Sequence, residues 1–367
     1  MTVRVSKPAF NLREKISELD KPTGIKGSEL LKTNTIQEAR DLIGAGRKNL
    51  IINGNFDVWQ RGTTFSSFNT MRYTADRWLQ YAAGSSTITA TQQPFTVGQT
   101  EVPGNPKYYY RMDNTPDPNT AWMELFYRIE DVTRFSGVPV TLSFWMRANK
   151  PQIGEDEMRL LQNFGNNGSA AVTVRGPLFD IGTSWKKYEF TFDLPSITGK
   201  TIESNNFLQI HLVRISNAVA SDTYYDLAQF QLEYGRAATT FEQRSLGEEL
   251  HLCKRYYQQV GPASSGVMVL NGAGNGTGRI RGMHQLVPEM RVAPTVTHDT
   301  SSENPTFYAY KSSPPSYSSV NGFSSTSKVF FWDFNTSTHN QVGYAFDVKG
   351  SGARLQIDAE LPSTYSP

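Results

Sequence analysis

Residues 49–62 read NLIINGNFDVWQRG, and this stretch decides how the chain folds. Leu50 and Ile52 alternate with their neighbours as in a β-strand, and the Asn-Gly-Asn sequence that follows is typical of a turn or a bulge. Phe56 and Trp59 then add large apolar side chains. We therefore expect this stretch to be the opening strand of a large β-domain.

A second stretch, residues 224–235 (YYDLAQFQLEYG), is interpreted as the closing strand of the same domain. Strict alternation divides its side chains between two faces of a sheet. One face would hold Ala228, Phe230, Leu232 and Tyr234, and the opposite face would hold Leu227, Gln229, Gln231 and Glu233. We expect the two stretches to meet in one sandwich, with Ile52 and Phe230 in the same core.

Composition narrows the class of protein. The chain has 367 residues and a formal net charge of +2, with no block of like charges, which disfavours nucleic acid as a partner. The single cysteine, Cys253, excludes an intrachain disulfide and a cysteine-based zinc site. The N-terminus lacks an apolar signal core, and no apolar run is long enough for membrane insertion. Synthesis in a reducing cytoplasm without secretion by a signal peptide is expected.

The chain divides into four segments, and the expected fold class is mainly β. Residues 1–48 contain two capping-box patterns and are expected to form short N-terminal helices. Residues 49–243 contain short alternating segments separated by turn residues, which predict an antiparallel jelly-roll sandwich. Residues 244–263 predict a linking helix that reaches residue 260 and is ended by the Gly-Pro pair after it, and residues 264–367 predict a C-terminal β-sandwich.

Two of these segments leave alternatives open. The short helices of residues 1–48 need a partner for their apolar faces, either their own downstream domain or another subunit or particle. The linking helix has apolar residues at near-heptad spacing, so it either covers the sandwich or packs against copies of itself about an axis.

The two stretches also carry a resemblance. Residues 49–62 and 231–242, with ADRW at 75–78 and the segment 247–257, resemble bacteriophage tail-fibre and virion appendage proteins. Residues 49–243 are also similar to carbohydrate-binding modules of the galactose-binding-like jelly-roll type. The resemblance implies a virion location, docking on other tail proteins through residues 1–48, a homotrimer, and host attachment by receptor binding to a surface glycan or protein.

Sugar binding requires aromatic platforms with polar neighbours, because sugars have apolar C–H faces and polar rims. Alternation directs several such side chains away from the core, and if their strands share a sheet they form one surface. The candidates are Trp122, Trp145, Arg147 and His211, accompanied by Glu124, Arg128 and Gln209. The alternative is that a neighbouring subunit, the leader or the linking helix covers this surface.

A second candidate contact region is the segment 301–327, interpreted as a loop rich in Ser, Tyr, Gly and Asn. This is the composition of adaptable recognition loops, in which tyrosine supplies contact area at a low entropy cost. The candidate contact residues are Tyr308, Tyr310, Tyr317 and Phe323. The alternative is an ordinary solvated linker between strands.

Metal binding and catalysis have weaker support. The resemblance to jelly-roll sugar-binding modules implies a structural calcium, for which Asn53, Asp57, Asp226 and Glu233 could supply oxygen atoms. Turn and strand-end hydrogen bonds are the alternative role of these four residues, and no cofactor is required. No pair of carboxylates is singled out and no Gly-x-Ser-x-Gly motif occurs, so we expect a protein that is not an enzyme. The alternatives are a polysaccharide-degrading tailspike and a purely structural virion adaptor.

Overall fold

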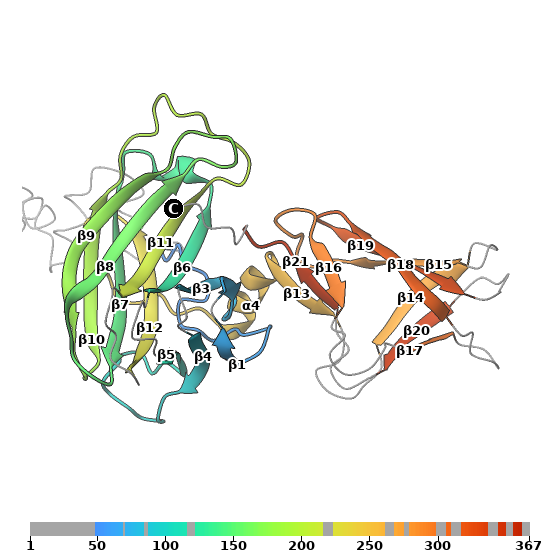
Figure 1. Cartoon of the computed structure of the whole chain (residues 1–367), viewed down its shortest axis with the longest axis horizontal. Helices are drawn as coiled ribbons and strands as arrows, with labels where there is room; N and C mark the ends of the chain where they lie inside the picture. Colours follow the sequence, from blue (N-terminus) through green and yellow to red (C-terminus); the bar gives the residue numbers. More distant parts are fainter. Residues whose placement is uncertain are drawn as a thin grey trace, which may run out of the picture.

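The computed structural model is mainly β, as the sequence predicts, and its strands form a sandwich and a C-terminal β-region (Figure 1). The expected N-terminal helices lie outside the described residues. The structure describes residues 48–68, 70–83, 87–115, 122–215, 223–260, 268–274, 279–298, 306–309, 317–336, 344–349 and 355–361.

The sandwich consists of two six-stranded antiparallel sheets. The β12 sheet contains, in spatial order, β1 (Thr64–Phe68), β4 (Thr87–Pro94), β5 (Tyr108–Thr115), β12 (Thr223–Tyr234), β7 (Pro139–Ala148) and β10 (Lys186–Asp193). The β11 sheet contains β2 (Arg72–Tyr73), β3 (Trp78–Ala83), β6 (Trp122–Glu130), β11 (Phe207–Ile215), β8 (Gln152–Asn163) and β9 (Val172–Ile181). A short 3-10 helix, η1 (Val132–Phe135), follows β6.

The core lies between the two sheets and follows the alternation in the sequence. Leu142, Phe144 and Met146 of β7 are fully buried, and Phe190 and Phe192 of β10 belong to the same cluster. Phe144 stacks on the ring of Phe230, with the ring centroids 4.7 Å apart. Burial of these side chains supplies the main favourable free energy of the sandwich.

The strand predicted before Asn53 is absent, which corrects the prediction from the sequence, whereas the turn predicted at Asn53, Gly54 and Asn55 is confirmed. Residues 52–55 form a turn, and Asn53 and Phe56 have φ values of 58° and 56°, which a β-strand does not allow. From residue 48 onward, the first described strand is β1, which pairs with β4. The predicted meeting with the distant stretch is nevertheless confirmed, because Ile52 packs against the core cluster that contains Phe230.

The contact between these two stretches is made by backbone groups and one asparagine. The Leu50 N–H donates to the carbonyl of Leu232 at 2.9 Å, and the Phe230 N–H donates to the carbonyl of Gly54 at 2.8 Å. Asn49 donates from Nδ2 to the Phe230 carbonyl at 3.0 Å and accepts at Oδ1 from the Leu232 N–H at 3.2 Å. Gly54 is required here because a Cβ atom would lie 2.1 Å from the Phe230 carbonyl oxygen.

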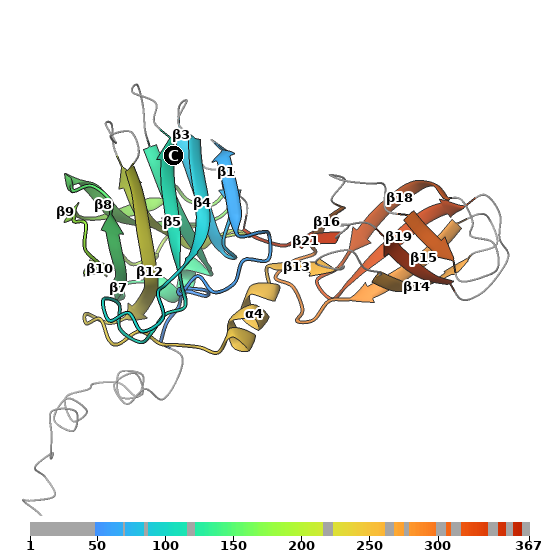
Figure 2. The same ribbon diagram turned by 90° about the horizontal axis from the view of Figure 1, so that it is seen from below.

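The linking helix is shorter than the sequence predicts. α4 spans Leu246–Lys254, and Ser245 caps it by accepting from the Glu248 N–H. The chain then forms β13 (Tyr257–Val260), which pairs with β21 (Leu355–Asp358), so the expected helix at residues 255–260 is wrong. Pairing with a strand about one hundred residues away decides this boundary. Figure 2 shows α4 between the sandwich and β13.

The C-terminal region contains two further antiparallel sheets. β13, β21 and β16 (Thr295–His298) form a three-stranded sheet. The segment 301–327, expected to be a loop, contributes β17 and β18 to a six-stranded sheet, which corrects that expectation. The order in this sheet is β17 (Thr306–Ala309), β20 (Tyr344–Lys349), β14 (Met268–Gly274), β15 (Arg279–Gln285), β19 (Val329–Thr336) and β18 (Tyr317–Ser325).

The tetrapeptide at residues 75–78 joins the sandwich to the C-terminal strands. Arg77 is buried, forms an ion pair with Glu360, and lies over the ring of Tyr256 at 3.4 Å. On the sandwich side, Trp78 donates from Nε1 to the carbonyl of Asn53 at 2.9 Å. The motif that carries the sequence resemblance is therefore a structural joint.

Asp76, in the same tetrapeptide, is a buried acid whose protonation is linked to folding. Burial raises the pKa of the Asp76 carboxyl from 3.8 to about 6, and the contacts with Arg61 and Gln60 oppose that rise only in part. The folded protein therefore retains this proton at pH values where the unfolded chain has lost it.

We predict that Gly54→Ala destabilises the protein by about 3 kcal/mol, because the added methyl group overlaps backbone that cannot move freely. Gly182→Ala is the matched control, since nothing lies within 4 Å of the position that its added methyl group would take. Urea unfolding measures both variants. Equal midpoints for the two variants would contradict the role given to Gly54.

We predict that Glu360→Gln lowers the free energy of unfolding by about 3 kcal/mol, because it leaves the Arg77 guanidinium buried without a counter-ion. The control is Asp193→Asn, which breaks the exposed ion pair with Arg236 and should cost under about 1 kcal/mol. Thermal and urea unfolding report both changes. If Glu360→Gln lowered the free energy of unfolding no more than Asp193→Asn does, the buried Arg77 would not depend on Glu360 as its counter-ion.

We predict that stability declines as the pH rises through the window from about 4 to about 6, because ionisation of Asp76 is disfavoured only in the folded state. Between pH 5 and pH 7.5 the free energy of unfolding of the wild type should fall by about 1 kcal/mol relative to that of Asp76→Asn, because the variant has no proton to release at this position. Urea midpoints of both proteins at the two pH values test this. If the urea midpoints of the wild type and of Asp76→Asn changed by the same amount between the two pH values, this prediction would be wrong.

Candidate functional site

A pocket of about 400 Å³ lies on the outer face of the β12 sheet. β7, β10 and β12 form its floor with Trp145, Lys187 and Gln229, and Lys187 lies directly opposite Trp145 in the strand register. The segments 103–104 and 238–243 contribute its walls. The pocket therefore combines an aromatic side chain, a cation, an amide and hydroxyl groups.

A β-bulge in β12 creates this arrangement. Ala228 lies opposite Trp145, whereas Gln231 lies opposite Ser143, so β12 has one extra residue between these two pairs. Gln229 lies in this interval with φ 52°, in the left-handed region that a glutamine rarely adopts. The bulge explains why strict alternation fails here.

The prediction that Leu227 and Phe230 face opposite sides of the sheet is wrong. Both are fully buried in the core cluster, because the extra residue shifts the alternation by one position. Gln229 was not among the predicted site residues. The sequence does contain a signal for the bulge at Gln229. Leu227 and Phe230 are both large and apolar but lie three positions apart, and within a strand two such residues reach the same face only if a bulge lies between them.

The amide of Gln229 has one satisfied and one unsatisfied end. Its Nε2 donates to the carbonyl of Pro103 at 2.7 Å. Because a carbonyl only accepts, the atom beside Pro103 must be the nitrogen, which fixes the orientation of the amide. Oε1 is buried and accepts no hydrogen bond from the residues that the structure describes. A buried acceptor without a donor costs stability, and Oε1, with less than 1 Å² of accessible surface, is not open to the cavity.

A cluster of aromatic and charged side chains borders the pocket on its Trp145 side. Trp145 packs against the outer cluster that contains Tyr109 and Trp185. Asp226 is fully buried and forms ion pairs with Arg147 at 2.9 Å and with Arg111 at 2.7 Å. Two guanidinium groups thus compensate one buried carboxylate, and each remains about one quarter exposed.

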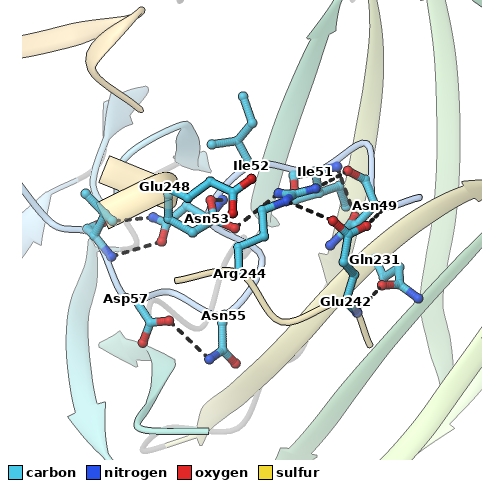
Figure 3. Close-up of polar contacts among 12 residues, drawn as sticks. Asn49, Ile51, Ile52, Asn53, Asn55, Asp57, Gln231, Glu242, Arg244 and Glu248 are labelled. Carbon is cyan, nitrogen blue, oxygen red and sulfur yellow. Dashed lines mark hydrogen bonds and ion pairs between the residues drawn. The ribbon is translucent and has the colours of Figure 1, made fainter. Parts of the chain in front are cut away.

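The opposite wall, residues 238–243, is fixed by polar contacts with the strand below it. The Thr239 N–H donates to Glu233 at 3.0 Å, and the Glu242 N–H donates to Oε1 of Gln231 at 2.7 Å. Glu242 in turn accepts from the Lys48 N–H at 2.7 Å. Figure 3 shows the contact between Glu242 and Gln231 and its continuation through Arg244, which pairs with Glu242, to the backbone of Asn49. The wall is therefore held in place before a ligand binds, which reduces the entropic cost of binding.

The structure separates the predicted aromatic surface into two faces. Trp145 and Arg147 lie on β7 in the β12 sheet, whereas Trp122 and His211 lie on β6 and β11 in the other sheet. His211 is buried, with its ring edge-on to Phe126 at 4.8 Å. The side chain of Trp122 lies outside the described residues. Of these four residues, Trp145 lines the pocket.

The candidate contact residues of the C-terminal region do not form one cluster either. Tyr308 lies in β17 and both Tyr317 and Phe323 lie in β18, and these strands are the opposite edges of the six-stranded sheet. Their side chains, and all of Tyr310, lie outside the described residues. Receptor contact through this region stays a prediction.

The four residues proposed for calcium have separate sets of partners. Asn53 is hydrogen-bonded to Val58, and Asp57 accepts from Asn55 at 3.2 Å (Figure 3). Asp226 is paired with arginines, as described above, and Glu233 accepts from Thr239. Within the described ranges, no three acidic, histidine or cysteine side chains gather as a metal site. Calcium binding stays a prediction.

Comparisons with known proteins find only distant likenesses. No protein-family model matches the sequence, and no curated protein matches it. Among solved structures, the chain is similar to the CBM22-1 xylan-binding domain of Paenibacillus barcinonensis Xyn10C, at 14% identity and a TM-score of 0.31, over 53% of this chain and 100% of that one. These values are too low to carry an argument about the ligand.

Two further structures show likenesses of the same order. The family 11 carbohydrate-binding module of Clostridium thermocellum has 13% identity and a TM-score of 0.28, over 47% of this chain and 94% of that one. The enzymatically active domain of bacteriophage CBA120 tailspike protein 4 has 13% identity and a TM-score of 0.31, over 51% of this chain and 21% of that one.

Among the described residues, no helix is both long enough and apolar enough to cross a bilayer.

We predict that Gln229→Gly is more stable than Gln229→Ala by about 1 kcal/mol, because both variants lose the hydrogen bond to Pro103 but only glycine adopts a positive φ without strain. Gln229→Ala should lower the stability, since alanine keeps the strain and loses the hydrogen bond to Pro103. Urea unfolding of both variants checks the order. If the glycine variant were less stable than the alanine variant, the conclusion that Gln229 is strained at the bulge would be wrong.

Proposed function

We propose that this protein is a non-enzymatic subunit of a bacteriophage tail fibre or related virion appendage, and that it binds a surface glycan in the pocket beside Trp145. The observation that carries the proposal is the composition of that pocket. A partly exposed aromatic side chain, the side chain of Gln229, the ammonium of Lys187 and the hydroxyls of Thr239 and Thr240 surround one cavity. The apolar C–H face of a sugar can pack against the aromatic ring of Trp145, and sugar hydroxyls can form hydrogen bonds with the polar groups.

The size and rigidity of the pocket also support a glycan ligand. A volume of about 400 Å³ lies within the ordinary range for small-ligand sites and suits one or two sugar rings. The floor is formed by strands, and the wall at 238–243 is fixed through Glu233 and Gln231. Such a site binds without prior reorganisation.

The virion part of the proposal rests on the sequence resemblance of residues 49–62, 75–78 and 231–242. In this assignment residues 1–48 dock on other tail proteins, three copies of the chain associate, and the bound glycan or protein belongs to the host surface. The joint at Arg77 and Glu360 supports such a role, because it holds the C-terminal strands on the sandwich. Tyr308 and Tyr317 remain candidates for a second contact with the host.

A glycan array with the full chain tests the ligand class. We expect binding to at least one surface polysaccharide, and Trp145→Ala should weaken it by about tenfold or more through loss of the aromatic contact. Leu178→Ala is the control, because this apolar side chain is 61% exposed and lies on β9, in the other sheet of the sandwich. No glycan binding would overturn the proposal in favour of a structural adaptor, and release of reducing ends would favour the tailspike alternative.

The assembly part is tested separately. The purified chain should sediment as a trimer, and deletion of residues 1–47, which keeps Lys48 and its contact with Glu242, should abolish incorporation into particles while leaving glycan binding intact. A stable monomer would count against the trimer. Unfolding of the sandwich after the deletion would indicate that the leader packs on its own domain.

A further inference from the structure

This inference deepens the proposed function and rests on it: it concerns which class of glycan the outer face of the β12 sheet binds. Next to Trp145 on that face lies a row of charged side chains. Asp226 of β12 lies directly opposite Arg111 of β5 on one side and Arg147 of β7 on the other. Arg147 is two positions from Trp145 in the same strand, so both side chains point to the same face and their Cα atoms are about 7 Å apart.

One of these two arginines suffices for the carboxylate of Asp226. Arg111 donates from Nε to Oδ1 at 2.7 Å and from Nη2 to Oδ2 at 2.9 Å, so it binds both oxygen atoms. Arg147 donates to the same Oδ2 through Nε at 2.9 Å. A guanidinium has five N–H groups, so the two Nη groups of Arg147 keep donors that Asp226 does not use. Asp226 is fully buried, whereas 27% of the Arg147 side chain is exposed and open to a ligand.

The row carries an excess of positive charge. Two guanidinium groups and one carboxylate give it a net charge of +1. Asp113, two positions further along β5, has an interaction of its own. The pocket end of the face is balanced, because Lys187 pairs with Glu189 at 2.6 Å. Glu189 lies opposite Ser143, about 13 Å along the sheet from Arg147, which exceeds the screening length of about 10 Å at 0.1 M salt, so Glu189 does not cancel this excess.

Aromatic rings hold both guanidinium groups in place. Arg111 lies over the ring of Tyr224 at 3.8 Å, and Arg147 lies over the ring of Trp185 at 5.0 Å. Side chains that are already ordered lose little further entropy when a ligand binds. A carboxylate accepts two parallel N–H bonds from a guanidinium, and such charge-assisted bonds are roughly twice as strong as neutral ones. A sugar hydroxyl has no charge and cannot accept in this paired geometry, so the row distinguishes an acidic sugar from a neutral one.

We propose that this face binds acidic glycans, with one sugar in the pocket against Trp145 and the carboxylate of the neighbouring sugar on the Nη groups of Arg147. Arg111 acts as a positioning residue, because it holds Asp226 and thereby the Nε end of Arg147. Uronic acids are the class of sugar that fits, since their carboxylate is attached directly to the ring.

The test compares each glycan that binds the full chain on the array with its carboxyl-reduced form and its methyl ester. We expect the glycans that bind to contain a uronic acid. Reduction, which replaces the carboxylate with a hydroxymethyl group, should weaken binding by about 10- to 100-fold, the range for hydrogen bonds to a charged group. The methyl ester keeps both oxygen atoms but not the charge, and it should bind as weakly as the reduced form. Added salt should weaken binding of the acid more than that of the reduced form.

Variants assign the preference to Arg147. Arg147→Gln should bring the ratio of the affinities for the acid and for the reduced form close to one, and Arg111 still binds both oxygen atoms of Asp226 in this variant. Trp145→Ala should weaken binding of both forms and leave the ratio unchanged. Arg147→Lys keeps the charge and loses the paired donors, so its ratio should fall below that of the wild type even if Arg147→Gln fails to fold.

The matched control is Arg175→Gln. Glu157 pairs with both Arg159 and Arg175, so it is also a carboxylate shared by two arginines. This second cluster lies on β8 and β9, in the other sheet of the sandwich. The control variant should retain the wild-type ratio.

The outcomes are distinguishable. Binding of neutral glycans as tightly as acidic ones would overturn this inference while leaving the proposed glycan binding in place. A wild-type ratio in the Arg147 variants, or a loss of the ratio in Arg175→Gln, would also overturn it, because the selecting charge would then lie elsewhere. The absence of binding to every glycan would overturn the proposed function, and this inference with it.

Discussion

The close approach of Gly54 to β12 is the constraint on which the rest of the structure depends. The Phe230 N–H reaches the Gly54 carbonyl, and Asn49 bonds to backbone groups of both Phe230 and Leu232. β12 lies in the middle of its sheet, between β5 and β7, so a shift at this point would move both neighbours. The same strand carries Gln229 immediately before Phe230. One short stretch of β12 therefore fixes the core on its inner face and the pocket on its outer face.

The sequence predicted the parts of the fold that depend on side-chain alternation within one strand. The faces of β7 and β10 follow from alternation, because both strands run without a bulge through the pairs that join them. It did not predict the left-handed residues Asn53 and Phe56, since their conformation is imposed by contacts with Val58 and β12. Nor did it predict the end of α4, which is set by pairing with β21.

The candidate site was predicted only where it depends on alternation within a single strand. Trp145 and Arg147 were correctly placed away from the core, because outward alternation is a local property of β7. Membership of a sheet is set by pairing between distant strands, so alternation could not show that Trp122 and His211 belong to the other sheet. Gln229 was missed because a bulge breaks the period on which the prediction relied.

The attachment of the C-terminal strands has a mechanical consequence. β13 follows α4 directly, and residues 359–361 return to the sandwich, where Tyr73 donates to the Leu361 carbonyl at 2.9 Å. The three-stranded sheet is therefore held to the sandwich at two separate points rather than by one connection. A pulling force on this sheet would be shared between the two points, so its orientation would follow that of the sandwich.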